Sequence, residues 1–164
     1  MLISNEWLKD YVNVDQSVQA LAERITRTGI EVDDIIDYTK DIKNLVVGHV
    51  LSKTPHPNAD KLNICQVDLG EEEPVQIVCG APNVDEGQHV IVAKVGGRLP
   101  GGIKIKRAKL RGERSEGMIC SLQEIGISSH VTPKNFESGI YVFPEAVKPG
   151  TDALEALYLN DQVM

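Results

Sequence analysis

The chain has 164 residues, of which 41% are hydrophobic, 25% charged and only 4% aromatic, and its net charge is −7. This is the composition of a soluble globular domain whose core must be built mainly from Val, Ile, Leu and Ala, which favours strands. No apolar run approaches the roughly 18 to 20 residues that span a bilayer, and the N-terminus lacks the pattern of a secretory signal. We therefore expect a cytoplasmic protein without membrane contact.

The first 39 residues are predicted to be largely helical. In Ser4–Val12 the apolar side chains share one face of a short helix. Ser17 can cap a second helix, which Gly29 would end. An extended exit is expected over Ile30–Ile36.

From Ile42 onward, short apolar runs alternate with turn residues. They predict strands at Leu45–Lys53, Leu62–Leu69, Val75–Cys79, His89–Val95, Ile103–Leu110 and Gly117–Ser121. A glycine-rich turn over Gly96–Gly102 would join the fourth run to the fifth. About five short strands in about 80 residues indicate a closed or partly closed antiparallel barrel.

Beyond Gly126 a polar loop is expected, followed by a last strand at Gly139–Phe143 and a helix capped by Thr151. The chain stops at Met164 without a tail or capping signal, so we expect a piece of a longer gene product.

Three cysteines, Cys65, Cys79 and Cys120, are widely spaced and lie inside apolar runs. Buried reduced thiols are the expected state, in preference to a disulfide or a zinc site. Cys79 could be considered as a nucleophile, but the sequence shows no His–acid pair that would activate it.

One segment reverses the charge of the chain. Between Lys94 and Arg114 there are eight basic residues and a single acid, Glu113. A solvated edge strand protected by lysines would explain two or three of these cations but not all eight. The density of positive charge favours a surface that binds phosphates.

The loop His56–Lys61 is stiffened by Pro57, and its polar side chains either contact RNA or form a turn in which Asp60 caps the next element. A metal site at His56 and Asp60 is a third interpretation, but the further ligands it needs are not evident. Ser115 could donate to phosphate or to the backbone.

Three motifs together resemble the tRNA-binding domain found in several aminoacyl-tRNA synthetases and associated proteins. They are His56-Pro-Asn-Ala-Asp-Lys-Leu62, Val78-Cys-Gly-Ala-Pro-Asn83 and Leu110-Arg-Gly-x-x-Ser-x-Gly-Met118. The flanks, Met1-Leu-Ile-Ser-x-x-Trp7-Leu-Lys and Phe143-Pro-Glu-Ala with Pro149-Gly-Thr-Asp-Ala153, resemble the start of bacterial phenylalanine–tRNA ligase beta subunits.

The resemblance implies a mainly β fold with flanking helices (α+β). A five-stranded antiparallel barrel of the oligonucleotide-binding (OB) type over residues 40–150 would be inserted in a partial helical or α+β domain, residues 1–39 and 151–164. It also implies a parent ligase of two alpha and two beta subunits that uses ATP and Mg²⁺ to attach phenylalanine to its tRNA. The catalytic site of that family lies on the alpha subunit, so this piece should hold neither a catalytic residue nor a cofactor of its own.

Candidate tRNA contacts are the cations of the basic segment and the polar residues of two motifs. They are Lys94, Arg98, Lys104, Lys106, Arg107, Lys109, Arg111, Arg114, Ser115, His56, Asn58 and Lys61. Because no Phe, Trp or Tyr occurs between Leu45 and Ser129, base stacking should contribute little to binding. Two alternatives are a structural module that packs within the synthetase without RNA contact, and a separate dimeric tRNA-binding protein.

Overall fold

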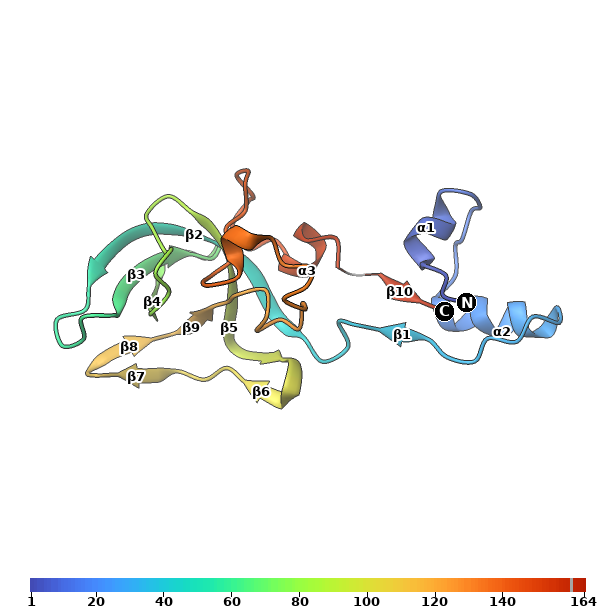
Figure 1. Ribbon diagram of the computed structural model, residues 1–164, viewed down its shortest axis with the longest axis horizontal. Coiled ribbons are helices and arrows are strands. Elements are labelled where there is room, and N and C mark those ends of the chain that lie inside the picture. Colours follow the sequence, from blue (N-terminus) through green and yellow to red (C-terminus); the bar gives the residue numbers. More distant parts are fainter. Residues whose placement is uncertain (160) are drawn as a thin grey trace. The chain divides into compact units, whose positions relative to one another are not determined.

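The computed structural model describes residues 1–159 and 161–164; Asn160, within the predicted 151–164 segment, lies outside the described residues. Contacts divide the chain into two units, Met1–Lys40 with Tyr158–Met164, and Asp41–Leu157 (Figure 1). The fold is mainly β, and the described residues include three short α-helices. This confirms the predicted fold class. Within the described residues, no helix is both long and apolar enough to cross a bilayer.

The first unit begins with the two predicted helices, α1 (Asn5–Lys9) and α2 (Val18–Arg27). Ser4 caps α1 by accepting the Trp7 N–H, and Ser17 caps α2 by accepting the Ala20 N–H. Each hydroxyl satisfies one of the N–H groups that a helix start leaves without a partner.

Segments from both ends of the sequence complete this unit. Strand β1 (Ile36–Asp37) pairs antiparallel with β10 (Gln162–Val163). A small core forms where Met164 packs with Val18 and Ala22 of α2. The apolar face of α2 is therefore covered by the chain end, because the helix alone cannot bury it.

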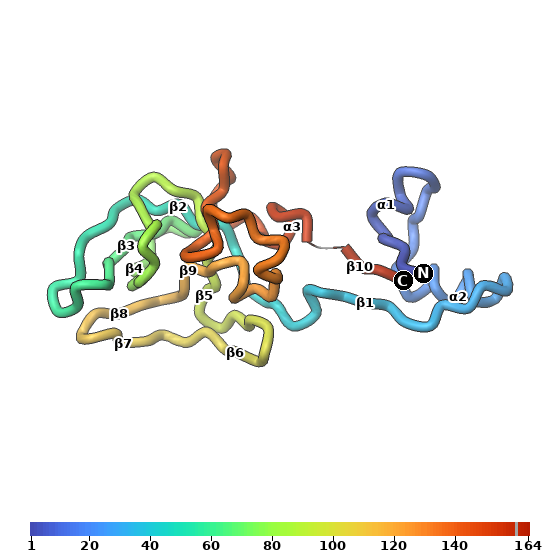
Figure 2. Tube along the Cα trace, in the orientation of Figure 1, coloured from blue at the N-terminus to red at the C-terminus, as the bar shows by residue number. Residues whose placement is uncertain are grey.

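The second unit is built on a curved antiparallel sheet, whose main strands run from cyan through green to yellow in Figure 2. Its strands are β2 (Lys43–Pro55), β3 (Asn63–Asp68), β4 (Val75–Cys79), β5 (His89–Leu99) and β6 (Ile103–Lys104). They lie in the order β4-β3-β2-β5-β6, and β9 (Gly117–Ile119) also pairs with β5. This gives the near-closed barrel of five main strands that the sequence predicts.

The interior of the barrel is packed with β-branched side chains, among them Val50, Val67, Ile77, Val90 and Val92, which are fully buried. The strand β2 passes close to its neighbours at Gly48. A Cβ atom there would lie 2.7 Å from methyl groups of Val67 and Val92. The glycine therefore lets the long strand bend tightly around the core.

A hairpin of β7 (Ala108–Leu110) and β8 (Glu113–Ser115) closes the barrel against β4. The backbone N–H of Glu116 donates to the carbonyl of Gln76 over 2.8 Å. The side-chain amide of Gln76 donates to the carbonyl of Arg114 over 2.9 Å. The seam thus depends on one polar side chain of β4 as well as on the backbone.

Two predictions about the basic segment were wrong in detail. Strand β5 continues through Gly96 to Leu99, so the turn is only the 3₁₀ segment η1 (Pro100–Gly102). The predicted single strand Ile103–Leu110 divides into β6 and β7, because Ile105 turns inward and is buried. Its backbone exchanges hydrogen bonds with Gly96 and Gly97 over 2.9 Å each.

The predicted last strand at Gly139–Phe143 is also wrong, since only Val142 forms a β-bridge, to Val90. The segment follows a 3₁₀ turn, η2 (Lys134–Phe136), and is fixed by a side chain. Asn83 donates to the carbonyl of Ile140 over 2.8 Å and accepts from its N–H over 3.0 Å. Asn83 thus replaces the backbone of a neighbouring strand.

The final short helix, α3 (Ala153–Ala156), is capped by Asp152 and not by Thr151 as predicted. Asp152 accepts the Glu155 N–H over 3.0 Å. The Thr151 hydroxyl donates instead to the carbonyl of Lys148 over 2.7 Å. By its contacts, α3 belongs to the second unit.

All three cysteines are buried and unpaired, as predicted. Burial raises the pKa of Cys65 to about 11 and of Cys120 to about 12, and raises that of Cys79. Cys79 is therefore not poised as a nucleophile.

We expect the native chain to resist alkylation by iodoacetamide at pH 8, and the urea-unfolded chain to react rapidly at all three thiols. The pKa values of the thiols in the folded chain lie above the unfolded value near 8.5. The stabilisation of the fold that the buried neutral thiols provide is therefore complete below that pH. It is lost as the pH rises from there through about 11 for Cys65. Mass spectrometry of alkylated native protein would contradict this if it found rapid labelling at pH 8.

Candidate functional site

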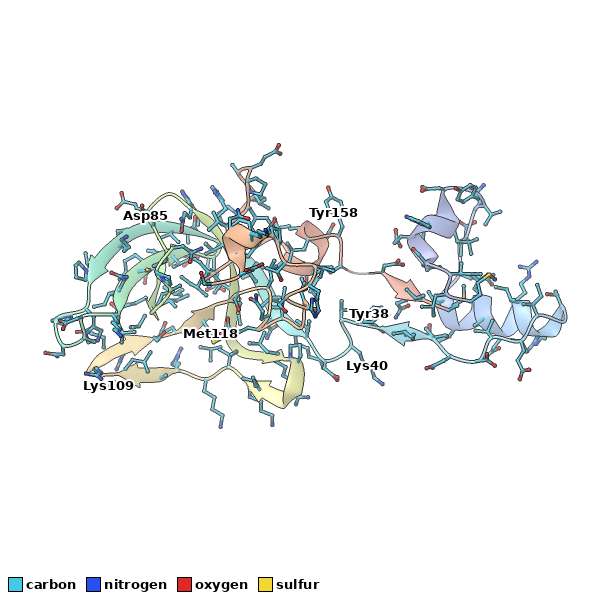
Figure 3. All side chains as sticks on the ribbon, in the orientation of Figure 1. Tyr38, Lys40, Asp85, Lys109, Met118 and Tyr158 are labelled. Atoms are coloured by element: carbon cyan, nitrogen blue, oxygen red, sulfur yellow. The ribbon has the colours of Figure 1, made fainter. Side chains whose placement is uncertain are left out.

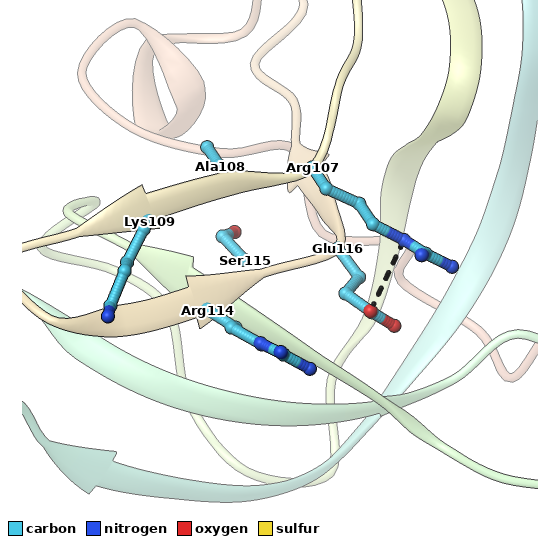
Figure 4. A pocket seen from close by; sticks show the side chains of 6 residues that line it. All are labelled: Arg107, Ala108, Lys109, Arg114, Ser115 and Glu116. Carbon is cyan, nitrogen blue, oxygen red and sulfur yellow. Dashed lines mark ion pairs between the residues drawn. The ribbon is translucent and has the colours of Figure 1, made fainter.

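The hairpin β7–β8 carries exposed cations on both of its strands and at its tip. Lys109 of β7 is the direct register partner of Arg114 of β8. Directly opposed residues in an antiparallel pair share one face, so the two side chains start from adjacent positions on that face; Figure 4 shows both, with their charged ends directed apart. Like charges in this arrangement destabilise a hairpin. The hairpin therefore retains an unfavourable pair that a bound anion would relieve.

The hairpin also borders an open depression of about 320 Å³, lined by residues of both its faces. Its lining consists of Arg107, Ala108, Lys109, Arg114, Ser115 and Glu116. Arg107 is held there by an ion pair to Glu116, with a nitrogen–oxygen distance of 3.4 Å. Figure 3 shows Lys109 on the side of this unit that lies away from Asp85.

Two of the eight predicted cations are paired with acids: Arg107 with Glu116, and Lys94 with Glu71 of the β3–β4 loop. The other six make no ion pair within the described residues. They are Arg98, Lys104, Lys106, Lys109, Arg111 and Arg114, and all six are exposed. The basic segment thus presents positive charge that is not neutralised by nearby carboxylates, although the net charge of the chain is −7.

Ser115 does not belong to the exposed surface, although it was a predicted contact. Its side chain is buried, accepts the Val78 N–H over 3.0 Å and donates to the carbonyl of Gly117 over 3.0 Å. Alternation along β8 places it on the face opposite Arg114, toward the barrel. We assign it to closure of the β4–β8 seam.

His56 likewise has a structural position and is only 5% exposed. The backbone N–H of Asn58 donates to its Nδ1 over 3.0 Å. Nδ1 is therefore the acceptor, and Nε2 carries the hydrogen that is donated to the carbonyl of Leu110 over 2.9 Å. Both ring nitrogens are thus engaged within the chain, and His56 joins the β2–β3 loop to the hairpin.

The tip of the hairpin is a two-residue turn with positive φ at Arg111 (49°) and Gly112 (99°). This is the pattern of a type I′ turn, in which Gly or Asn is usual and another residue costs roughly 1 to 3 kcal/mol. The side-chain amide of Asn58 lies 3.5 Å from the carbonyl of Arg111. The fold thus brings Asn58 and Arg111, both predicted contacts, to one place, and leaves Lys61 exposed on the adjoining loop.

Lys43 is a cation that the sequence analysis missed. It begins β2 and is the direct register partner of Arg98 in β5. No local signal in the sequence could have associated it with the basic segment, because the association exists only through strand pairing.

Aromatic side chains gather elsewhere in this unit. The ring of Tyr141 contacts those of Phe136 and Phe143, with centroids 4.9 and 5.1 Å apart respectively. The backbone N–H of Phe143 donates to the carbonyl of His89, at the opposite end of β5 from Arg98. The hairpin face itself therefore offers charge without an aromatic stacking platform. Among the described residues, no three His, Cys, Asp or Glu side chains could hold a metal ion together.

A family model described as "Putative tRNA binding domain" matches residues 45–152. Over all 164 residues the chain is 98% identical to the phenylalanine–tRNA ligase beta subunit of Staphylococcus epidermidis and 84% identical to that of Staphylococcus aureus (strain USA300). It spans only 20% of the length of these curated relatives.

Several solved structures are similar to the chain, two of them from Plasmodium vivax and Pyrococcus horikoshii. The C-terminal domain of Plasmodium vivax p43 is 24% identical, with a TM-score of 0.47 over 70% of this chain and 61% of that one. A MetRS-related protein from Pyrococcus horikoshii is 23% identical, with a TM-score of 0.46 over 74% of this chain and 97% of that one.

Proposed function

Because the chain belongs to the family of tRNA-binding domains, we propose that its barrel binds tRNA through the phosphate backbone, with the β7–β8 hairpin as the principal contact. Lys109, Arg111 and Arg114 would neutralise phosphates, while Asn58 and Lys61 would contact the backbone from the neighbouring loop. The membership confirms the resemblance inferred from the three motifs.

The observation that carries this proposal is the opposition of Lys109 and Arg114 across the hairpin, without a carboxylate partner for either within the described residues. A protein surface gains nothing in stability from this pair. A nucleic acid backbone supplies closely spaced negative charges, and their neutralisation releases counterions. An exposed cationic pair is thus explained by a polyanion better than by folding.

The setting of this barrel follows from its relatives. We propose that the chain is the N-terminal portion of a phenylalanine–tRNA ligase beta subunit and works in the cytoplasm together with a catalytic alpha subunit in a heterotetramer. ATP and Mg²⁺ would act at the catalytic site of the whole enzyme, outside this chain. The barrel would then assist the ligase by holding tRNA without taking part in the chemistry.

Salt dependence tests the proposal. If about four phosphates are contacted, a tenfold rise in salt is expected to lower the affinity of the chain for tRNA by roughly a thousandfold. The measurement is a fluorescence titration of a phenylalanine-accepting tRNA, with an unrelated tRNA alongside. Because the contacts are to phosphates, we expect both tRNAs to bind with similar affinity and the same salt slope.

An affinity that stays constant from low to high salt would refute phosphate binding. The remaining explanation would then be a module that packs against another part of the synthetase. A strong preference for one tRNA at high salt would instead indicate readout of bases.

A further inference from the structure

The fold assembles a second row of cations that is separate from the hairpin. Lys43 of β2 is the register partner of Arg98 in β5, and Arg98 is the partner of Lys104 in β6. Direct partners lie on the same face, and neighbouring strands are about 5 Å apart. The three side chains therefore form a line of about 10 Å across three strands.

This row carries no counter-charge. All three residues are exposed, and none makes an ion pair within the described residues. Each adjacent pair is one of like charges directly opposed, which disfavours strand pairing. The chain has more acids than bases, so a carboxylate could readily have occupied one of these positions.

A local irregularity of the backbone creates the row. The register changes from Leu45–Ala93 to Lys43–Arg98, so β5 advances by five residues while β2 advances by two. Asn44 takes a φ of 55° at this point. Such bulges re-aim side chains and are frequent next to functional sites.

At the bulge, β2 and β5 approach so closely that position 97 has no room for a side chain. A Cβ atom on Gly97 would lie 2.8 Å from the carbonyl oxygens of both Lys43 and Lys94. The ends of β2 and β5 are thus fixed against each other, and the row is part of a rigid framework.

Protection of a sheet edge does not explain the arrangement. Lys104 lies on the edge strand β6, where a lysine discourages pairing with other chains. Arg98, however, lies on β5, which is flanked by β2 and β6 at this point. An edge function therefore does not account for Arg98, which stands between two paired strands.

We propose that Lys43, Arg98 and Lys104 form a second phosphate-binding site that engages the same RNA as the hairpin. This rests on the proposed function and adds a place of contact to it. Lys109 is only five positions after Lys104, so the Cα atoms of these members of the two sites are at most about 18 Å apart. One structured RNA can therefore contact both, and each site raises the effective concentration of phosphates at the other.

The test compares three variants of the 164-residue chain with the parent. They are a row variant (Lys43→Gln, Arg98→Gln and Lys104→Gln), a hairpin variant (Lys109→Gln and Arg114→Gln) and the two combined. A chain with Lys134→Gln and Lys148→Gln is the control, since both lysines are exposed and lie outside either site. The probe is tRNA, titrated at several salt concentrations, and thermal unfolding checks each fold.

We expect the row variant to bind tRNA at least tenfold more weakly near 0.1 M salt, with a salt slope reduced by about two to three. The combined variant should lose more affinity for tRNA than either the row variant or the hairpin variant alone. Folding should be unimpaired, because like-charge repulsion is removed. The single variant Lys43→Gln should by itself reduce the slope by about one.

A row variant that binds tRNA like the parent, while the hairpin variant binds weakly, would overturn the second site and leave the proposed function standing. If neither variant loses affinity, both proposals fail. If the control loses as much as the row variant, the effect reflects net charge alone, and the second site is likewise refuted.

Discussion

Replacement of Lys109 by glutamate is expected to make the chain more stable and, at the same time, a weaker ligand for tRNA. The substitution turns the like-charged pair with Arg114 into a pair of opposite charges. Such cross-strand pairs contribute roughly 0.2 to 1 kcal/mol. The measurement is the free energy of urea unfolding, which should rise by this amount.

For RNA the same change removes one phosphate contact and adds repulsion. We expect the affinity for tRNA to fall by at least about tenfold near 0.1 M salt, and the salt slope to fall by about one. A loss of binding together with a gain in stability excludes misfolding as the cause. The two effects can be told apart because the lysine at position 109 disfavours folding while it favours RNA binding.

Lys148→Glu provides the matched control, since Lys148 is exposed in the same unit and forms no part of either cationic site. It makes the same change in net charge and should alter tRNA affinity much less. An unfolding free energy that falls in Lys109→Glu, or an affinity equal to that of the control, would count against a hairpin shaped by RNA binding.

The second large effect is expected at His56, which does not contact RNA in our proposal but holds the hairpin that does. In His56→Ala the carbonyl of Leu110 and the N–H of Asn58 both lose a partner, and a buried ring is removed. Unsatisfied buried groups cost about 1 to 3 kcal/mol, and the cavity adds to this. We expect a loss of about 2 to 4 kcal/mol of stability.

Tethering and general stability can be separated by two milder variants. A glutamine amide at position 56 can donate to the carbonyl of Leu110 as Nε2 does, whereas an asparagine oxygen can accept from Asn58 as Nδ1 does. If the contact to the hairpin is what matters for RNA, His56→Gln should restore tRNA affinity more fully than His56→Asn.

The measurements for this pair are tRNA affinity and amide hydrogen exchange at the hairpin. Exchange of the β7 and β8 amides should be faster in His56→Asn than in His56→Gln. Equal affinity of both variants and the parent would show that the position of the hairpin does not depend on His56.

Much of the barrel could be predicted from local pattern. Val75–Cys79 was predicted with the bounds that β4 has, and in the first unit the cap of α2 at Ser17 was also predicted. The family could be recognised because three short motifs occur in a fixed order. These are properties of neighbouring residues, which the sequence displays directly.

The failures occurred where a distant part of the chain decides the conformation. Gly96 and Gly97 were expected to form a turn, but they continue β5 because the carbonyl of Gly97 and the N–H of Gly96 bond to Ile105. The strand predicted at Gly139–Phe143 is held by the Asn83 side chain in place of a ladder. Local propensity cannot anticipate such long-range partners.

By itself the sequence determined most of the strand segments, the position of the basic segment and the family to which the chain belongs. Only the tertiary structure decided which residues of that segment are available. It buried His56 and Ser115, paired Arg107 with Glu116, and added Lys43 through its register with Arg98. The reason is that charge and alternation are local properties of a chain, whereas burial and cross-strand neighbours depend on how distant segments pair.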